Sequence, residues 1–243
     1  MLDKKQEQEW QKHVLAEYPN EACAFVVDGK VVPVRNIHDN PTQQFKVDPS
    51  VVVTLQGNVQ GFLHSHPYDV EEEASKFPRE WASEMDMIGW IKDDKPWGIV
   101  TTEGESVSDI VWYDDSIDAI EPWEGRQFIS GKNDCYSIIR DYYRVELGVA
   151  LKNFPREMAW WEKGRNHYLD LFAEAGFEEV PLNQIQTNDL LLVHLGTGVV
   201  THAMLVTGNN QILHHLINRK SGYDTLAKWN RLITKAIRYV EKS

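Results

Sequence analysis

An acidic stretch that is poor in apolar residues divides this chain into two differently patterned halves. It covers residues 114–125, contains Pro122, and has helix and strand patterns on both sides. Such stretches are typical of the linkers between domains. The chain has 243 residues, which is enough for two separate cores. Because each half mixes helices with strands, the sequence predicts two α+β domains, residues 1–118 and residues 119–243.

The charge balance and the hydropathy exclude several classes of function. The chain carries 25 Lys and Arg against 37 Asp and Glu, a formal net charge of −12. We therefore expect no nucleic-acid partner. No apolar run approaches the roughly 18 residues of a membrane-spanning helix, and the N-terminal segment lacks the apolar core of a secretory signal. We expect no membrane span and no signal peptide. Two distant cysteines, Cys23 and Cys135, favour a reducing compartment over disulfides.

The first half has the pattern of a small sheet with helices. Apolar runs predict a hairpin over residues 23–36, turning at Asp28-Gly29, and a buried strand over residues 59–67. A helix is expected over residues 79–92, and further strands over residues 97–102 and 108–113.

Two histidines end the buried strand. Residues i and i+2 of a strand point to the same side, so His64 and His66 can hold one metal ion. A catalytic zinc needs a third protein ligand and keeps one position open. Asp86 is the best candidate, because it shares a helix face with Ser83 three residues earlier. Glu21, at the start of an apolar strand, is the candidate general base.

Three motifs resemble the JAMM/MPN metallopeptidases over about residues 10–113: Pro19, Glu21 and Cys23 before an apolar strand; His64-Ser65-His66-Pro67; and Ser83-x-x-Asp86. The resemblance implies a zinc ion, Zn2+, held by His64, His66 and Asp86. It implies Glu21 as proton shuttle for the water that zinc activates. It also implies that the Ser83 hydroxyl donates a hydrogen bond to the developing oxyanion.

The spacing between these motifs departs from the family. Sixteen residues separate His66 from Ser83, more than is usual, so we interpret residues 68–80 as an insertion that covers or shapes the site. Ser75 stands nearer the usual spacing, but the residue three positions later is a proline, which cannot bind metal. Asp69 and the run Glu71 to Glu73 remain alternative ligands.

The second half carries a candidate nucleophile. Cys135 opens a helix expected over residues 134–147, where Asp134 is a favoured N-cap residue. The positive helix end favours the thiolate, so we expect the pKa of Cys135 to lie below the free value of about 8.5. A second helix is expected over residues 164–177.

The base is expected to come from two strands, residues 198–207 and residues 211–217, joined by a turn at Asn209-Asn210. If these strands pair, they bring His202 and His214 together. His202 is then the base and His214 orients its ring.

Four segments resemble the NlpC-type cysteine peptidases, which are papain-like, over about residues 125–240: Asp134-Cys135-Tyr136-Ser137; Asn188-Asp189-Leu190; His202-Ala203 with Val206, Gly208 and Asn209; and Ile212-x-His214. The resemblance implies Cys135 as nucleophile, His202 as general base and His214 as orienting member. It places Asp134 and Ser137 near the substrate groove and the Cys135 backbone N–H in the oxyanion hole. Tyr136 departs from the small residues usual there, and the register between His214 and His215 stays open.

A JAMM/MPN-like domain followed by an NlpC-type domain resembles the tail assembly protein K family of long-tailed phages. The resemblance implies a peptidoglycan hydrolase that acts on peptide stems during infection or tail assembly. It implies tail tip proteins as partners, the host cytoplasm during assembly and the virion tail tip afterwards. Two alternatives stay open: a structural tail-tip component with vestigial sites, and a cellular bacterial peptidase.

Overall fold

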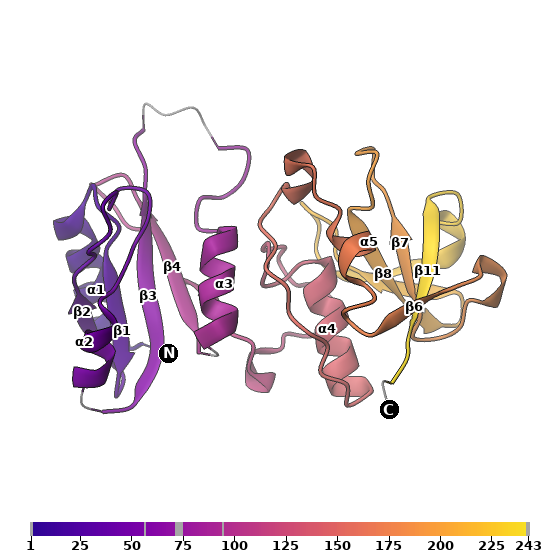
Figure 1. The fold of residues 1–243 in the computed structure, drawn as a ribbon, viewed down its shortest axis with the longest axis horizontal. Helices are drawn as coiled ribbons and strands as arrows, with labels where there is room; N and C mark the ends of the chain where they lie inside the picture. The colour runs from indigo at the N-terminus through magenta and orange to yellow at the C-terminus, as the bar shows by residue number, and fades with distance from the viewer. Residues whose placement is uncertain (1, 56, 71–74, 94, 242–243) are drawn as a thin grey trace. The chain divides into compact units, whose positions relative to one another are not determined.

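The computed structural model describes residues 2–55, 57–70, 75–93 and 95–241. By its internal contacts the chain divides into two compact units, Met1–Ala119 and Ile120–Ser243. The division falls within the acidic stretch, and each unit has its own sheet (Figure 1).

The first unit is built on a five-stranded sheet with the order β2-β1-β3-β4-β5. The tight hairpin between β1 and β2 turns at Asp28 and Gly29, whose φ angles of 48° and 73° suit a two-residue turn. β3 pairs with β4 in parallel, and the other neighbours are antiparallel. The strands are β1 Cys23–Val27, β2 Lys30–Val34, β3 Val59–Pro67, β4 Trp97–Thr102 and β5 Val111–Tyr113.

Two helices cover the two faces of this sheet, and a short one, α2 Pro49–Thr54, precedes β3. α1 Lys4–Glu17 buries Trp10 and Val14 in a cluster with Leu63 of β3. α3 Glu84–Asp93 lies over the opposite face, where a Cβ on Gly89 would stand 2.4 Å from the Trp97 ring. The missing side chain lets α3 lie directly on β4.

The second unit holds a six-stranded sheet in which all neighbouring strands are antiparallel, with the order β10-β9-β8-β7-β11-β6. Its β8 and β9 form the expected hairpin, and Asn209 and Asn210 take φ angles of 49° and 59° in the turn. The strands are β6 Phe177–Val180, β7 Leu190–Val193, β8 His202–Gly208, β9 Gln211–His214, β10 Gly222–Thr225 and β11 Ile233–Tyr239.

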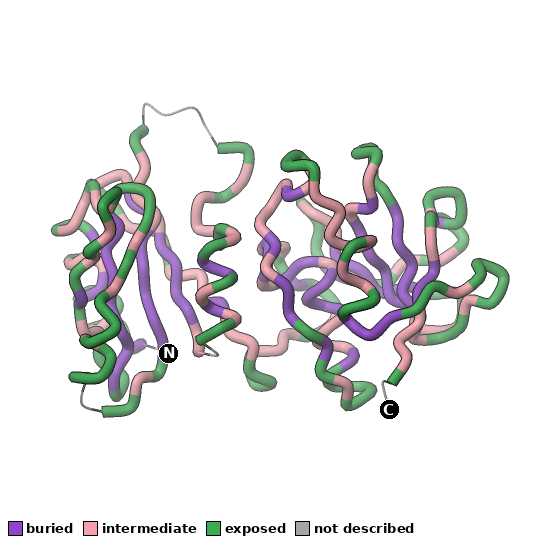
Figure 2. Tube along the Cα trace, in the orientation of Figure 1, coloured by how far each residue is buried: buried purple, intermediate pink, exposed green. Residues whose placement is uncertain are grey.

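One helix packs against the sheet to form the main core of this unit. α4 Cys135–Glu146 packs Ile138, Ile139 and Tyr143 against alternate residues of the sheet, among them Leu205. The strand residues that alternate with these face the opposite side of the sheet, where they pack around Trp229. Figure 2 shows buried chain along the central strands and in the first half of α4.

Several expected elements are shorter in the structure. The helix expected over residues 79–92 begins at Glu84, because Ser83 caps it. The helix expected over residues 164–177 is reduced to α5 His167–Leu171. It follows a 3-10 turn, Trp160–Lys163, that ends at Gly164 with a φ of 75°, and β6 begins at Phe177. Only the last three residues of the strand expected over 108–113 are a strand, β5. Among the described residues no helix is long and apolar enough to span a bilayer.

Candidate functional sites

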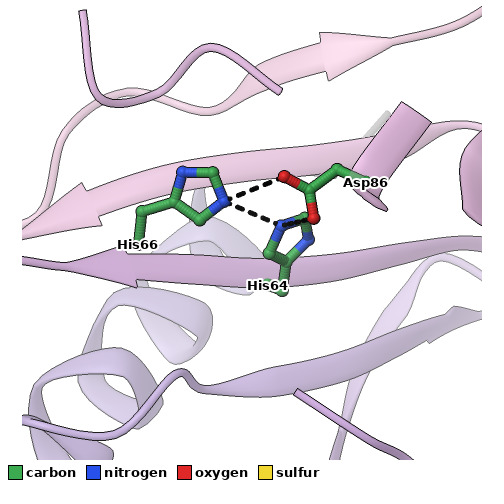
Figure 3. A group of neighbouring side chains, drawn as sticks. All are labelled: His64, His66 and Asp86. Atoms are coloured by element: carbon green, nitrogen blue, oxygen red, sulfur yellow. Dashed lines mark hydrogen bonds and ion pairs between the residues drawn. The ribbon is translucent and has the colours of Figure 1, made fainter. Parts of the chain in front are cut away.

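His64, His66 and Asp86 form a compact cluster in the first unit (Figure 3). The two Nε2 atoms lie 3.1 Å apart. Asp86 places Oδ1 3.2 Å from His64 Nε2 and Oδ2 3.3 Å from His66 Nε2. In the part of the chain that is described, no other group of His, Cys, Asp and Glu side chains converges in this way.

These separations suit a metal with tetrahedral coordination. Two ligand atoms about 2.0–2.1 Å from zinc at a tetrahedral angle are roughly 3.3–3.4 Å apart. The three separations in the cluster lie between 3.1 and 3.3 Å. Three protein ligands would leave one coordination position open, as catalytic zinc sites do.

Local structure sets the direction of each of the three side chains. His64 and His66 alternate with Ser65 along β3 and therefore face the α3 side of the sheet. Asp86 lies in the first turn of α3 in a reciprocal cap. The Asp86 N–H donates to Ser83 Oγ at 3.1 Å, and the Ser83 N–H donates to Asp86 Oδ2 at 2.8 Å.

The charges in this cluster are mutually dependent. Burial opposes ionisation of Asp86, but the two imidazoles hold the pKa of Asp86 well below its ordinary value. Burial lowers the pKa of His66, but the hydrogen bond and charge of Asp86 and the Arg79 carbonyl raise it to about 9. Burial lowers the pKa of His64. A buried carboxylate between two imidazoles thus favours a positive charge, whether a proton or a metal ion.

The segment that we interpret as an insertion, residues 68–80, supplies a hydrogen-bond partner for one of the two histidines. His66 Nδ1 donates to the carbonyl of Arg79 at 2.7 Å, so Nε2 faces the cluster and carries a lone pair for a metal once the ring has lost its second proton. A pocket of about 560 Å³ lies between the two ends of the insertion, with Tyr68, Phe77 and Arg79 in its lining. Asp69 is not part of the cluster, and Glu71 to Glu73 lie outside the described residues.

Glu21 is buried beside this cluster, directly before β1. Burial raises the pKa of Glu21 to about 7, with His66 lowering it and Asp86 raising it. A carboxylate with a pKa near neutrality suits a general base. Ser65, which the sequence analysis did not single out, is fully buried, and its hydroxyl accepts the Ala22 N–H at 2.8 Å. The residue between the two histidines thus fixes the backbone next to Glu21.

Ser83 lies at the exposed end of α3 beside Asp86. Because its Oγ accepts the Asp86 N–H, its own hydroxyl proton remains available to a further acceptor. Both the capping role and the hydrogen-bond donor role are compatible with this geometry.

In the second unit Cys135 is the first residue of α4. Asp134 caps the helix, and its Oδ1 accepts the N–H groups of Tyr136 at 3.0 Å and Ser137 at 2.8 Å. Asp134 and Ser137 are buried, at 5% and 2% exposure. They support the helix end, and their place near a substrate groove, which the resemblance implies, stays a prediction.

Arg156 is a site residue that the sequence analysis missed. It is buried and donates from Nε to Asp134 Oδ2 at 2.7 Å and from Nη2 to Ser137 Oγ at 2.7 Å. Its other donors bind Asn153 and the Phe154 carbonyl. The one available signal was a cation within an apolar and aromatic stretch, which requires a partner if it is buried.

The sulfur of Cys135 has partners that the sequence analysis did not identify. Its Sγ lies 2.9 Å from the Tyr168 hydroxyl and also meets the Ala203 N–H. Among the described contacts no hydrogen bond joins Sγ to His202, although Ala203 directly follows that histidine. Burial and the Asp134 charge raise the pKa of Cys135 to about 11, while Tyr168 and Ala203 lower it. The expected pKa below 8.5 is therefore wrong for this structure, because burial outweighs the helix end.

The two predicted imidazoles lie together on paired strands. His202 Nε2 is 3.1 Å from His214 Nδ1. Both rings contact Trp229, at centroid distances of 6.1 and 4.9 Å. Burial lowers the pKa of His202 to about 3 and that of His214 to about 4. His215 instead places Nε2 3.2 Å from the Arg219 carbonyl, so the register puts His214 beside His202.

Comparison with known proteins finds a family match in the second unit. Residues 122–238 match the NlpC/P60 family. A protein of that family from Staphylococcus aureus, described as similar to a lipoprotein, is 21% identical to this chain. The alignment covers 49% of this chain and 38% of that one, with a TM-score of 0.36.

Two phage proteins are similar over most of the chain. Tail tip assembly protein K of Escherichia phage lambda is 31% identical over 178 residues, which are 73% of this chain and 80% of its own length. Tail tip assembly protein K of Escherichia phage N15 is 28% identical over 246 residues, which are 93% of this chain and 91% of its own length.

Proposed function

The chain belongs to the tail tip assembly protein K family, and on that premise we propose that its second unit is a cysteine endopeptidase that cuts the peptide stems of peptidoglycan. The observation that carries the proposal is the pairing of His202 with His214 at 3.1 Å, within the residues that match the NlpC/P60 family. A buried imidazole oriented by a second one is the base that a cysteine nucleophile requires.

The proposed mechanism uses three side chains. His202 takes the thiol proton of Cys135 as the sulfur attacks the peptide carbonyl carbon. The tetrahedral intermediate collapses when the C–N bond breaks, and His202 returns the proton to the leaving amine. Water, deprotonated by His202, then hydrolyses the thioester and frees the sulfur. His214 holds the His202 ring and does not itself transfer the proton.

The proposed setting is the tail. The names of the two phage relatives support tail tip proteins as partners and the tail tip of the virion as the location. We place synthesis and assembly in the host cytoplasm. Of the two alternatives, a cellular peptidase lacks a specific supporting observation in this chain, whereas the raised pKa of Cys135 would also suit a purely structural tail component.

Purified peptidoglycan tests the peptidase proposal. The intact chain should release peptide fragments, to be identified by mass spectrometry, and Cys135→Ala should abolish their release. Cys23→Ala is the matched control, because Cys23 lies buried in the first unit and should be dispensable. Undiminished cleavage by Cys135→Ala would refute the role of the second unit.

We propose further that the first unit is a zinc-dependent metallopeptidase in which His64, His66 and Asp86 hold Zn2+. The spacing of their ligand atoms supports the proposal. When bound there, zinc would polarise a scissile carbonyl and promote ionisation of water. Glu21 then moves the proton, and Ser83 donates a hydrogen bond to the oxyanion.

Elemental analysis of the intact chain tests the metal proposal. We expect about one zinc per chain, lost in the double variant His64→Ala/His66→Ala and kept in Glu21→Gln. Zinc content that survives the double variant would refute the ligand set. Zinc content that survives Asp86→Ala alone would redirect the third ligand to the carboxylates of the insertion.

A further inference from the structure

Tyr168 is in contact with the atom that is proposed to react. Its hydroxyl oxygen lies 2.9 Å from Cys135 Sγ, although 33 positions separate the two residues in the chain. Tyr168 belongs to the short helix α5, whereas Cys135 begins α4. The contact therefore depends on the path of the irregular segment between these helices, and no sequence motif accounts for it.

The ring of Tyr168 is held in place by apolar and aromatic neighbours. It packs against the main core of the second unit and meets the ring of Trp160 edge-on at a centroid distance of 6.3 Å. Trp160 is itself buried, at 6% exposure. Anchoring of this kind limits the hydroxyl to positions near Sγ.

Either group can be the donor in this contact while the thiol keeps its proton, and the hydroxyl is the donor once the thiol has lost it. Burial, with the neighbouring Cys135 and Asp134, raises the pKa of Tyr168 well above its ordinary value, so the phenol keeps its proton. A sulfur that gives its own proton to a base becomes an acceptor. Tyr168 and the Ala203 N–H are then the two donors directed at it.

The charged and titratable groups around Sγ act on a negative sulfur in opposite directions. Asp134, in the cap of α4, opposes a negative sulfur, and Arg156 from the following segment favours it. His202 and His214 on β8 and β9 are neutral near pH 7, because burial lowers the pKa of each. The imidazoles therefore supply no standing positive charge, so beside Arg156 it is the fixed donors that can stabilise the thiolate.

Resting on the proposed peptidase function of Cys135, we propose that Tyr168 is a catalytic residue whose hydroxyl donates a hydrogen bond to Cys135 Sγ and stabilises the thiolate that attacks the substrate. The hydroxyl keeps its own proton throughout. The thiol proton still passes to His202. The hydrogen bond from Tyr168 lowers the free energy needed to remove that proton from the sulfur.

Alkylation of Cys135 by iodoacetamide tests this role without any peptidoglycan. The rate is measured against pH in the intact chain, and mass spectrometry of the Cys135 peptide separates it from Cys23. In Tyr168→Phe the midpoint of the profile should rise by about one to two pH units, the usual value of a hydrogen bond to a charged group. Below the midpoint the rate should fall roughly 10-fold or more.

Tyr143→Phe is the matched control. It also removes one buried phenol hydroxyl, which donates to the Asn188 carbonyl at 2.5 Å, and it should leave the alkylation profile unchanged. Ultraviolet absorbance of the thiolate, taken as the difference from each protein's Cys135→Ser counterpart, gives the same midpoint independently of alkylation. Circular dichroism checks that both variants are folded.

An unmoved profile in Tyr168→Phe, or one that moves to lower pH, overturns the role of Tyr168 and leaves the peptidase proposal standing. Peptidoglycan cleavage by Cys135→Ala refutes the peptidase proposal whatever the profile of Tyr168→Phe. The two failures are therefore distinguishable.

Discussion

Asp86 in the first unit and Asp134 in the second are both buried carboxylates at the start of a helix, but their partners differ. Asp86 lies between two imidazoles, which carry a positive charge only when a proton or a metal ion provides it. Asp134 is paired with the permanently charged guanidinium of Arg156. The first helix end is therefore open to an external cation, and the second is already neutralised.

The pKa values of two histidines, one in each unit, differ in a corresponding way. His66, beside Asp86, has a pKa raised to about 9 against the effect of burial. Burial lowers the pKa of His202 to about 3, and among the described residues its hydrogen-bond partner is His214 and not a carboxylate. The difference teaches that contact with a carboxylate can let a buried imidazole such as His66 hold a positive charge, whereas a buried imidazole without that contact, such as His202, stays uncharged near pH 7.

Removing the internal counterion should have the largest effect. Arg156→Met leaves Asp134 buried and unpaired, which costs about 3–5 kcal/mol of unfolding free energy in the second unit. Hydrogen exchange, measured peptide by peptide, should show the loss in residues 120–241 only. Lys163→Met removes an exposed ion pair and should change the free energy by less than about 0.5 kcal/mol. If Arg156→Met left the free energy of unfolding unchanged, the comparison between the two carboxylates would be wrong.

Adding a cation should affect only the first unit. Zinc at about 100 times its dissociation constant stabilises the state that binds it by roughly 2.7 kcal/mol. Exchange should slow in residues 2–119 and stay unchanged in the second unit, and a chelator should reverse the effect. The variant His64→Ala/His66→Ala should not respond. Equal protection of both units would show that zinc binds elsewhere.

Acid should weaken the second unit through its neutral histidines. Their folded pKa values, about 3 and about 4, lie below the unfolded value, so the unfolded chain binds more protons as pH falls below about 6.5. At about pH 5 each histidine costs roughly 2 kcal/mol. His214→Gln should remove the part of the pH dependence of the unfolding free energy that His214 contributes. Exchange rates corrected for their intrinsic pH dependence measure it, and a flat response would contradict the neutral pair.

The smallest effect is expected at the cap of α3. Ser83→Ala removes the acceptor for the Asp86 N–H and should cost about 1 kcal/mol in the first unit. Asp86 keeps its two imidazole partners, so zinc content should stay near that of the unchanged chain. A large loss of zinc would show that the cap, and not the imidazoles, fixes the position of Asp86.

The parts of the two sites that depend on the regular spacing of residues in a strand, helix or turn could be predicted from the sequence. The two-residue period of a strand puts His64 and His66 on one side of β3, and helical spacing puts Asp86 next to Ser83. The turn at Asn209-Asn210 likewise fixes the antiparallel pairing of β8 and β9.

The parts that depend on irregular chain could not be predicted. Arg156 and Tyr168 reach the start of α4 from 22 and 33 residues away in sequence, through a segment with little regular structure. The prediction for the pKa of Cys135 was wrong for a related reason. The helix end can be identified in a sequence, whereas the burial that outweighs it is set by tertiary packing.

Each candidate site takes all of its named side chains from one side of the division near residue 119. Genetic exchange between related phages that breaks the coding sequence there would transfer a whole site and leave the other intact. A break between the codons for Glu21 and Asp86, or between those for Asp134 and His214, would separate partners that must fit one another. Surviving recombinants should therefore have their crossovers concentrated in the codons of the acidic stretch.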